Sequence, residues 1–223
     1  MRQESIILNL HGVGTPDRQL EPGEARYWLS VEQFRDIVSI AASMRDKVAC
    51  QFTIDDSNMS DATIAGPHLA EMGFSTQIFV LTDRIGQRGS LDRSALFDLM
   101  AMGHTIGSHG HAHRDWKRLR EDQLVEEIHA PQQRLQDLTG QCVTAAGLPF
   151  GGYNRRVLAE ARRAGFERIY SSDGGTARER AWPIARTSLR RDMSPGEMRA
   201  LFDPEGIFQS LKRRIKGEIK KRL

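Results

Sequence analysis

Short hydrophobic stretches typical of β-strands alternate along this 223-residue chain with amphipathic stretches typical of helices. Strands are predicted at 6–10, 48–54, 76–81, 105–107, 143–146, 168–171 and 182–186. Helices are predicted at 31–45, 61–72, 92–102, 122–138, 155–164, near 197–201 and at 207–215. Because loops of only a few residues join them, the strands should run parallel with right-handed crossovers. Six or seven such units predict an α/β fold, a distorted or incomplete seven-stranded parallel (β/α) barrel.

Length and composition indicate one domain over residues 1–223. The chain is long enough to bury one good-sized core, and 39% hydrophobic and 27% charged residues are ordinary for a globular protein. Its 20 glycines and 8 prolines are scattered, without a linker or a repeat. We therefore expect the predicted units to form a single domain.

Positive charge gathers at the C-terminal end. Residues 210–223 carry a net charge of +6, against +3 for the whole chain. Apolar residues recur there at every fourth position, which predicts a basic amphipathic helix at 207–223. Such a helix could touch an anionic membrane surface or dock on the body with its lysines in water. No interleaving of aromatic and basic residues marks a nucleic-acid platform, so nucleic acid is not an expected partner.

The N-terminal residues and the two cysteines indicate the expected cellular location. The apolar run at 5–10 is too short for a signal sequence, so a cytoplasmic location is expected, with peripheral contact at the inner membrane face as an option. Cys50 and Cys142 fall at predicted strands without a CxxC neighbour. We expect both to be reduced core residues.

Polar residues follow three of the predicted strands. Asp55 and Asp56 end one strand, His109 ends another, and the turn at 149–151 follows a third. In parallel α/β folds the carboxyl ends of the strands form one rim, where chemistry collects. The three segments are therefore predicted to meet there.

The histidines at 109 and 113 have a spacing that suits a metal. Side chains at i and i+4 reach the same side of a helix or tight turn, and a carboxylate from another strand would complete a three-ligand open site. This spacing alone is a weak signal, and His111 lies between the two. The aspartate pair alone could instead cap the helix that follows Ser57.

Three stretches in order resemble the signatures of one family. Residues 52–56, FTIDD, resemble the TFDD signature of the polysaccharide deacetylases, carbohydrate esterase family 4 or NodB-homology domain. Residues 106–113, IGSHGHAH, are similar to its IGSH-xxx-H signature, and residues 146–151, AGLPFG, to its third motif around Pro-Phe/Tyr-Gly. The motif-bearing core runs from about 48 to 173, and the resemblance implies the barrel of that family.

The resemblance also implies roles for individual residues. Asp56, His109 and His113 would bind a divalent metal, with zinc favoured over cobalt, nickel or manganese. Asp55 would be the general base, which a nearby cation would keep ionised. The backbone N–H of Phe150 would help to hold the oxyanion.

Several positions depart from the family pattern. Ser57 replaces the usual glycine after the aspartate pair. Gly147 stands where the third motif has an arginine, so the side chain that normally braces the catalytic aspartate is predicted to be missing. No histidine follows His129, although the family takes its general acid from a leucine-x-histidine motif near the C-terminus. His11, at the end of the first strand, could serve as that acid or could simply pack at a strand–turn junction.

Four further residues are predicted to contact substrate. Pro149 would fix the turn that aims Phe150. Trp116 could stack on a sugar or belong to the core, and Asp173 could bind substrate or form an ordinary turn. Arg186 has the reach to stabilise charge but cannot donate a proton at neutral pH.

The leading functional hypothesis is a metal-dependent deacetylase that removes an N-acetyl group from an amino sugar in a polysaccharide, glycolipid or oligosaccharide intermediate. A hydrolase of a non-sugar amide or cyclic imide on the same fold is an alternative, because two family residues are missing. A non-catalytic carbohydrate-binding protein that keeps the metal is disfavoured by the presence of both aspartates. A two-histidine-one-carboxylate iron oxygenase is disfavoured because it needs no second carboxylate.

Overall fold

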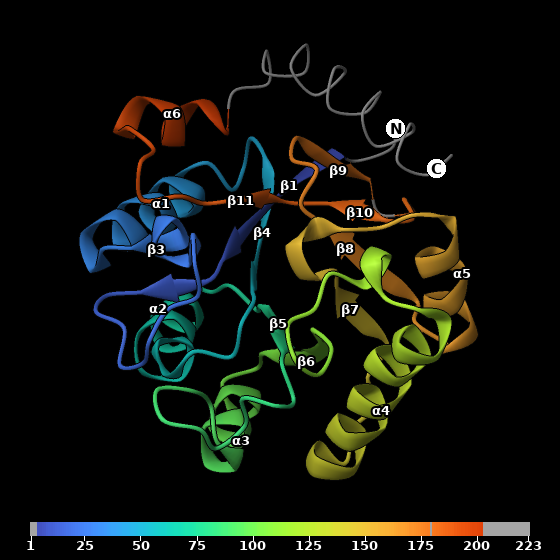
Figure 1. Ribbon diagram of the computed structural model, residues 1–223. Coiled ribbons are helices and arrows are strands. Elements are labelled where there is room, and N and C mark those ends of the chain that lie inside the picture. Colours follow the sequence, from blue (N-terminus) through green and yellow to red (C-terminus); the bar gives the residue numbers. More distant parts are fainter. Residues whose placement is uncertain (1–3, 179, 203–223) are drawn as a thin grey trace.

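A computed structural model describes residues 4–178 and 180–202 of the chain (Figure 1). One large sheet organises it, with the strand order β10-β8-β7-β6-β5-β4-β1-β11, and all neighbours along this path are parallel. The strands are β1 (Glu4–Leu10), β4 (Ala49–Ile54), β5 (Gln77–Val80), β6 (Thr105–Ser108), β7 (Ala145–Gly147), β8 (Arg168–Ser171), β10 (Ile184–Ala185) and β11 (Thr187–Ser188). β9 (Thr176–Arg178) pairs antiparallel with β1, so the sheet is mixed.

The last two strands bring the edges of the sheet together. β10 pairs with β8 at one edge and β11 pairs with β1 at the other, while only Arg186 separates β10 from β11 along the chain. The segment 184–188 therefore links both edges into a nearly closed, distorted barrel-like sheet. This confirms the predicted α/β barrel and shows where it closes.

Helices cover the outside of the barrel (Figure 1). They are α1 (Val31–Ser43), α2 (Gly66–Glu71), α3 (Arg93–Ala101), α4 (Glu121–Thr139), α5 (Arg155–Arg163) and α6 (Pro195–Ala200). The predicted helix at 61–72 starts as a π-helical turn, η2 (Asp61–Ala65), before α2. Local sequence sets several boundaries: Ser30 forms a capping box at the start of α1, and Gly140 ends α4 with a φ of 70°.

A connection that the hydrophobic pattern did not predict lies beside the rim. β2 (Gly12–Val13) pairs in parallel with β3 (Trp28–Leu29), and the residues between them include the 3₁₀ turn η1 (Glu24–Tyr27). Both strands are two residues long, which is too short to produce a recognisable alternation. Two further 3₁₀ turns, η3 (Trp116–Arg118) and η4 (Pro149–Gly151), follow β6 and β7.

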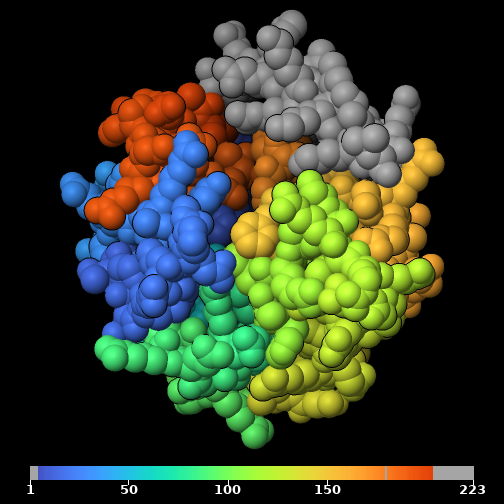
Figure 2. Space-filling view, viewed as in Figure 1, coloured from blue at the N-terminus to red at the C-terminus, as the bar shows by residue number. Residues whose placement is uncertain are grey.

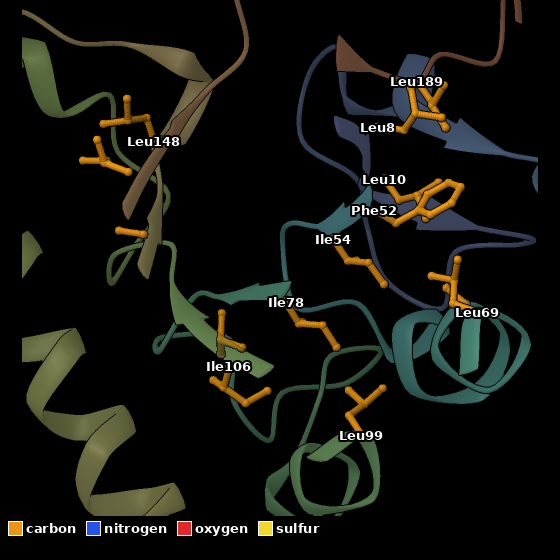
Figure 3. Packing of buried hydrophobic residues seen from close by; sticks show 14 of the residues in the cluster. Leu8, Leu10, Phe52, Ile54, Leu69, Ile78, Leu99, Ile106, Leu148 and Leu189 are labelled. Atoms are coloured by element: carbon orange, nitrogen blue, oxygen red, sulfur yellow. The ribbon is translucent and has the colours of Figure 1, made fainter. Parts of the chain in front are cut away.

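Successive side chains along each strand point to opposite faces of the sheet, and both faces are packed. On the outer face, residues such as Leu8, Phe52 and Ile78 pack in the large cluster beneath the helices (Figure 3). On the inner face, Phe79 and Tyr170 belong to a separate small cluster. Because side chains alternate along a strand, polar residues that follow the inner register near the carboxyl ends point into the mouth of the barrel.

The cysteine prediction was wrong for one residue. Cys142 is exposed and precedes β7 rather than lying in it. Cys50 is half-buried in β4, and burial raises the pKa of its thiol to about 12, so this thiol is inert. Both are free thiols.

Two other findings concern the membrane. Among residues 4–178 and 180–202, no helix has the length and apolar character to cross a bilayer. The predicted basic helix at 207–223, including the helix at 207–215, lies outside the described residues.

Candidate active site

The aspartate pair lies in a strained turn directly after β4. Asp56 and Ser57 have φ angles of 76° and 60°, in the left-handed region that favours glycine. Ser57 Oγ accepts a hydrogen bond of 2.7 Å from the backbone N–H of Leu81, which holds the turn in place. The turn separates the neighbouring carboxylates of Asp55 and Asp56, so that each can have different partners.

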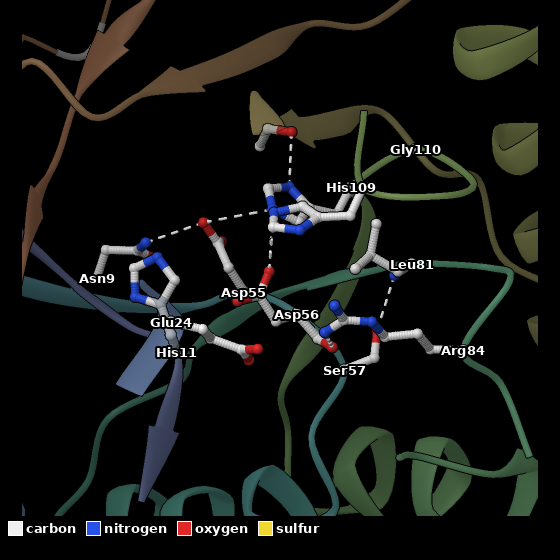
Figure 4. A network of polar contacts seen from close by, with 12 residues as sticks. Asn9, His11, Glu24, Asp55, Asp56, Ser57, Leu81, Arg84, His109 and Gly110 are labelled. Carbon is white, nitrogen blue, oxygen red and sulfur yellow. Dashed lines mark hydrogen bonds and ion pairs between the residues drawn. The ribbon is translucent and has the colours of Figure 1, made fainter. Parts of the chain in front are cut away.

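Asp56, His109 and His113 form a cluster of potential metal ligands, and Figure 4 shows Asp56 beside His109. His109 Nε2 and His113 Nε2 each lie 3.4 Å from Asp56 Oδ1, and the ligand atoms all lie within 4.8 Å of one another. His109 Nδ1 is 2.9 Å from the carbonyl oxygen of Gly147, which can only accept, so Nδ1 carries the proton. In the neutral ring, the lone pair of Nε2 is then directed at the cluster.

The donor set fits a divalent metal. Asp56 Oδ1 is buried and has no hydrogen-bond partner among the described residues. Burial alone would raise the pKa of Asp56, but the neighbouring rings of His109, His11 and His113 lower it, so the carboxylate is ionised. A buried anion that faces two ring nitrogens is stabilised by a cation, and one Asp with two His is a common ligand set for zinc and similar ions. The cluster could therefore hold such an ion, whose identity the donor set does not select.

Arg186 braces the predicted base. Its guanidinium makes two hydrogen bonds to the carboxylate of Asp55, at 2.7 and 2.9 Å, and Asn9 Nδ2 donates a third at 2.9 Å. Burial alone would raise the pKa of Asp55, but Arg186 outweighs it and the pKa lies below its ordinary value. Asp55 is therefore ionised at neutral pH, as a base must be, and the brace predicted to be missing comes from residue 186.

The environment of Arg186 contradicts the prediction that it contacts substrate. Its side chain is fully buried, with further hydrogen bonds to Asn9 and Thr53. The guanidinium also lies 5.1 Å from the ring centre of Phe79 on the inner face of the barrel. No face of the cation is left for a ligand.

The position that the third motif gives to arginine is crowded here. A Cβ on Gly147 would lie 3.0 Å from Phe79 Cγ and 3.2 Å from His109 Nδ1. A side chain at 147 would therefore crowd Phe79, the ring that packs against Arg186, and could be accommodated only if that ring moved by a few tenths of an ångström.

His11 lies where the prediction put it, at the end of β1 on the rim (Figure 4). Its Nδ1 is buried without a hydrogen-bond partner among the described residues, and its ring centre is 4.8 Å from that of Tyr27. Burial lowers its pKa, although the carboxylates of Asp56 and Asp55 act in the opposite direction. His11 is therefore neutral at pH 7 and has a ring nitrogen free to exchange a proton.

The turn after β7 presents an aromatic ring beside the cluster. Phe150 is 63% exposed, and its ring stacks on His113 at 4.3 Å between centres. Its φ of 56° is unusual for a bulky residue, and the preceding Pro149 is buried in η4. The space-filling view shows the surface hollowed between the N-terminal segment, in blue, and the yellow-green segments (Figure 2).

Two of the predicted substrate contacts have structural roles instead. Trp116 is fully buried in the outer core, so it offers no face for a sugar ring and that prediction was wrong. Asp173 accepts hydrogen bonds from the hydroxyls of Tyr153, at 2.6 Å, and Ser171, at 2.9 Å. These bonds match the alternative of an ordinary structural turn.

Sequence reasoning missed three residues that position the site: Asn9, Glu21 and Arg84. Asn9 could have been identified from the sequence, since it is the polar residue within the apolar run 6–10 of β1 and lies on the inner register. Glu21 and Arg84 lie outside the strands and gave no such signal. Glu21 is 2.9 Å from His113 Nδ1, and Arg84 donates to the carbonyl oxygen of Asp56 at 3.1 Å.

The sequence matches known proteins over the part that carries the site. The family model described as "Polysaccharide deacetylase" matches residues 43–169, which is more than half of the chain. The "Putative polysaccharide deacetylase YxkH" of Bacillus subtilis is 25% identical over 150 residues, which cover 67% of this chain and 53% of that protein. This chain thus spans about half the length of that relative.

Solved structures share the fold. A Streptococcus pyogenes deacetylase, PplD, in complex with acetate superposes with a TM-score of 0.79 at 19% identity, over 92% of this chain and all of that one. The polysaccharide deacetylase BC0361 of Bacillus cereus gives 0.76 at 16% identity, over 91% of this chain and 70% of that one. At these identities the likeness establishes the barrel architecture.

Proposed function

This chain belongs to the polysaccharide deacetylase family of hydrolases, and we propose that it removes N-acetyl groups from an amino sugar in a metal-dependent reaction. The sugar would be part of a polysaccharide, a glycolipid or an oligosaccharide intermediate. The observation that carries the proposal is the placement, on one rim, of a buried Asp-His-His cluster next to an ionised carboxylate. A metal ligand set and a separate base are the two requirements of hydrolysis by an activated water.

A metal held by Asp56, His109 and His113, zinc being our first choice, would act as a Lewis acid on the acyl carbonyl and make a water more acidic. Asp55 would accept the proton of the attacking water as its oxygen bonds to the acyl carbon. The Phe150 N–H would donate to the developing oxyanion. The C–N bond would then break to give acetate and the free amine.

His11 is our candidate for the group that protonates the leaving amine. It lies on the rim near both aspartates and has a ring nitrogen without a partner. Because His11 is neutral at pH 7, it would first take up a proton, which Asp55 could supply after it has received one from water. This role would replace the missing C-terminal histidine.

The brace from Arg186 bears on the choice of substrate class. Two missing family residues, the third-motif arginine and the C-terminal histidine, favoured the alternative of a non-sugar amide or imide. The bidentate pair between Arg186 and Asp55 removes the first of these reasons, and His11 is our candidate to replace the second residue. Phe150, exposed and adjacent to the metal cluster, supplies an aromatic face of the kind on which sugars stack.

Acetate release from a panel of N-acetylated sugars and glycolipids tests the proposal. The full chain is assayed with zinc, with cobalt or after chelation, beside Asp55→Asn, whose amide oxygen can still accept from Arg186. We expect metal-dependent release that Asp55→Asn lowers by about 10²–10⁴-fold. Release that is unaffected by chelation, or that Asp55→Asn leaves intact, would refute the proposed chemistry.

A further inference from the structure

Glu21 makes a contact that the metal-binding motifs do not include. Its Oε2 lies 2.9 Å from Nδ1 of His113, on the opposite side of the ring from the nitrogen that faces Asp56. A carboxylate accepts, so this contact places the ring proton on Nδ1 and leaves Nε2 with its lone pair toward the cluster. For His109 the carbonyl of Gly147 has the same effect.

Arg84 extends this contact into a closed ring of interactions. It forms an ion pair with Oε1 of Glu21, and its other terminal nitrogen donates to the backbone carbonyl of Asp56 at 3.1 Å. The chain of contacts runs from the Asp56 carboxylate to His113, to Glu21, to Arg84 and back to the Asp56 backbone. Asp56 and His113 both have left-handed φ angles, 76° and 50°. The ring thus connects two ligand residues whose own backbones are strained.

A second set of contacts links the loop that carries Glu21 to the turn that follows Asp56. The backbone N–H of Glu21 donates to Glu24 at 2.8 Å, and Glu24 is buried in an ion pair with Arg18. Arg18 Nε donates to Asn58 Oδ1 at 2.8 Å, two residues after Asp56. The loop is therefore held in place independently of the contact between Glu21 and His113.

We propose that Glu21 is a positioning residue for His113, so that the loop of residues 14–23 is part of the metal site. The inference rests on the proposed metal binding by Asp56, His109 and His113. Glu21 lies outside the segment 43–169 that matches the family model, so the three motifs alone do not complete the site. Carboxylates that hold a ligating histidine fix its tautomer and orientation and increase its basicity, which raises metal affinity.

Metal affinity tests the proposal without any substrate. Zinc binding to the full chain is measured by competition with a chromophoric chelator for wild type, Glu21→Gln and Asp17→Asn. Asp17 is an exposed residue of the same loop that pairs only loosely with Arg88, so its change removes the same charge without touching His113. We expect Glu21→Gln to weaken zinc binding by about 10–100-fold and Asp17→Asn to leave it unchanged. Equal affinities for the two variants would overturn the proposal.

A second measurement separates positioning from folding and from the proposed function. Side-chain ¹⁵N NMR of the metal-free protein reports the tautomer of His113, and far-UV circular dichroism checks the fold. We expect a protonated Nδ1 in wild type and Asp17→Asn, and a mixture of tautomers in Glu21→Ala, which has no side-chain acceptor for Nδ1–H. An unchanged tautomer in a folded Glu21→Ala would overturn the role of Glu21. If wild type itself binds no zinc, the proposed function fails and the metal role of Glu21 fails with it, while the tautomer still decides whether Glu21 holds His113.

Discussion

The proposed base, Asp55, and the proposed metal ligand His113 lie on one rim, but different kinds of structure hold them. Asp55 follows a barrel strand and is 2% exposed, and its partner Arg186 stands between the two strands that close the sheet. His113 lies in a loop, and the side chain of its partner Glu21 is 41% exposed. Breaking a buried pair leaves a charge without water, whereas a partly exposed partner is readily replaced by solvent. We therefore expect changes around the base to cost folding stability, and changes around His113 to cost metal affinity in a folded protein.

The largest expected effect is at Arg186. Arg186→Met should lower the free energy of unfolding by about 3–5 kcal/mol, because it leaves Asp55 buried and unpaired. Urea unfolding measures the loss. Arg88→Met is a suitable control, since that arginine is 87% exposed and its loss should change stability by less than about 1 kcal/mol.

The double variant Asp55→Asn with Arg186→Met tests whether the loss of stability comes from a charge left without its partner. Removing both charges should cost less than the sum of the two single changes, because neither partner is then left ionised and alone. Strict additivity would mean that the pair is not the source of the loss.

Two aromatic residues near the proposed metal ligands, Trp116 and Phe150, should respond to substitution in opposite ways. Trp116→Ala should destabilise the protein by about 3–5 kcal/mol, because it empties a fully buried site. Phe150→Ala should change stability by less than about 1 kcal/mol, since the ring is 63% exposed, but should raise KM for a sugar substrate. Thermal unfolding and steady-state kinetics separate the two. An unchanged KM in Phe150→Ala would remove the sugar-stacking role of that ring.

A smaller effect is expected at an ion pair away from the rim. Burial alone would raise the pKa of Glu160 on α5, but hydrogen bonds from Arg163 of the same helix and from His129 of α4 lower it below its ordinary 4.5. A lowered folded-state pKa gives stability that is complete above about pH 4.5 and is lost as the pH falls through the folded value. Arg163 is 60% exposed, so the gain should stay below about 1 kcal/mol.

Unfolding of wild type and Glu160→Gln across pH 7 to 3 tests this expectation. The difference between the two proteins should be constant above about pH 5 and should shrink toward pH 3. A difference that grows on acidification would contradict the lowered pKa.

The barrel and the proposed ligand set were predictable from short stretches of the sequence. Strand and helix patterns predicted the alternation, the spacing of His109 and His113 suited a single ion, and the resemblance to the family motifs implied Asp56 as the third ligand. The brace was not predictable, because it depends on how the sheet closes. Arg186 reaches Asp55 only where β10 and β11 join the two edges, and pairing between distant segments leaves no local pattern. The same holds for Glu21, which contacts a residue 92 positions away.

Burial explains the remaining error at the site. Trp116 follows the metal motif closely in sequence, which favoured a role in substrate binding, but its side chain points into the core under the helices. Phe150, which was predicted to act through its backbone, is the aromatic side chain that is exposed. Proximity in sequence did not indicate which of the two faces solvent.

The most direct test of the separation between base and metal site is a zinc titration of wild type, Asp55→Asn and His113→Ala, followed by acetate release from the same samples. We predict that Asp55→Asn binds zinc as wild type does but releases acetate about 10²–10⁴-fold more slowly. His113→Ala should lose zinc and activity together. If Asp55→Asn, shown by circular dichroism to be folded, lost zinc as fully as His113→Ala, the two aspartates would share one role, and the assignment of Asp55 as the base would be wrong.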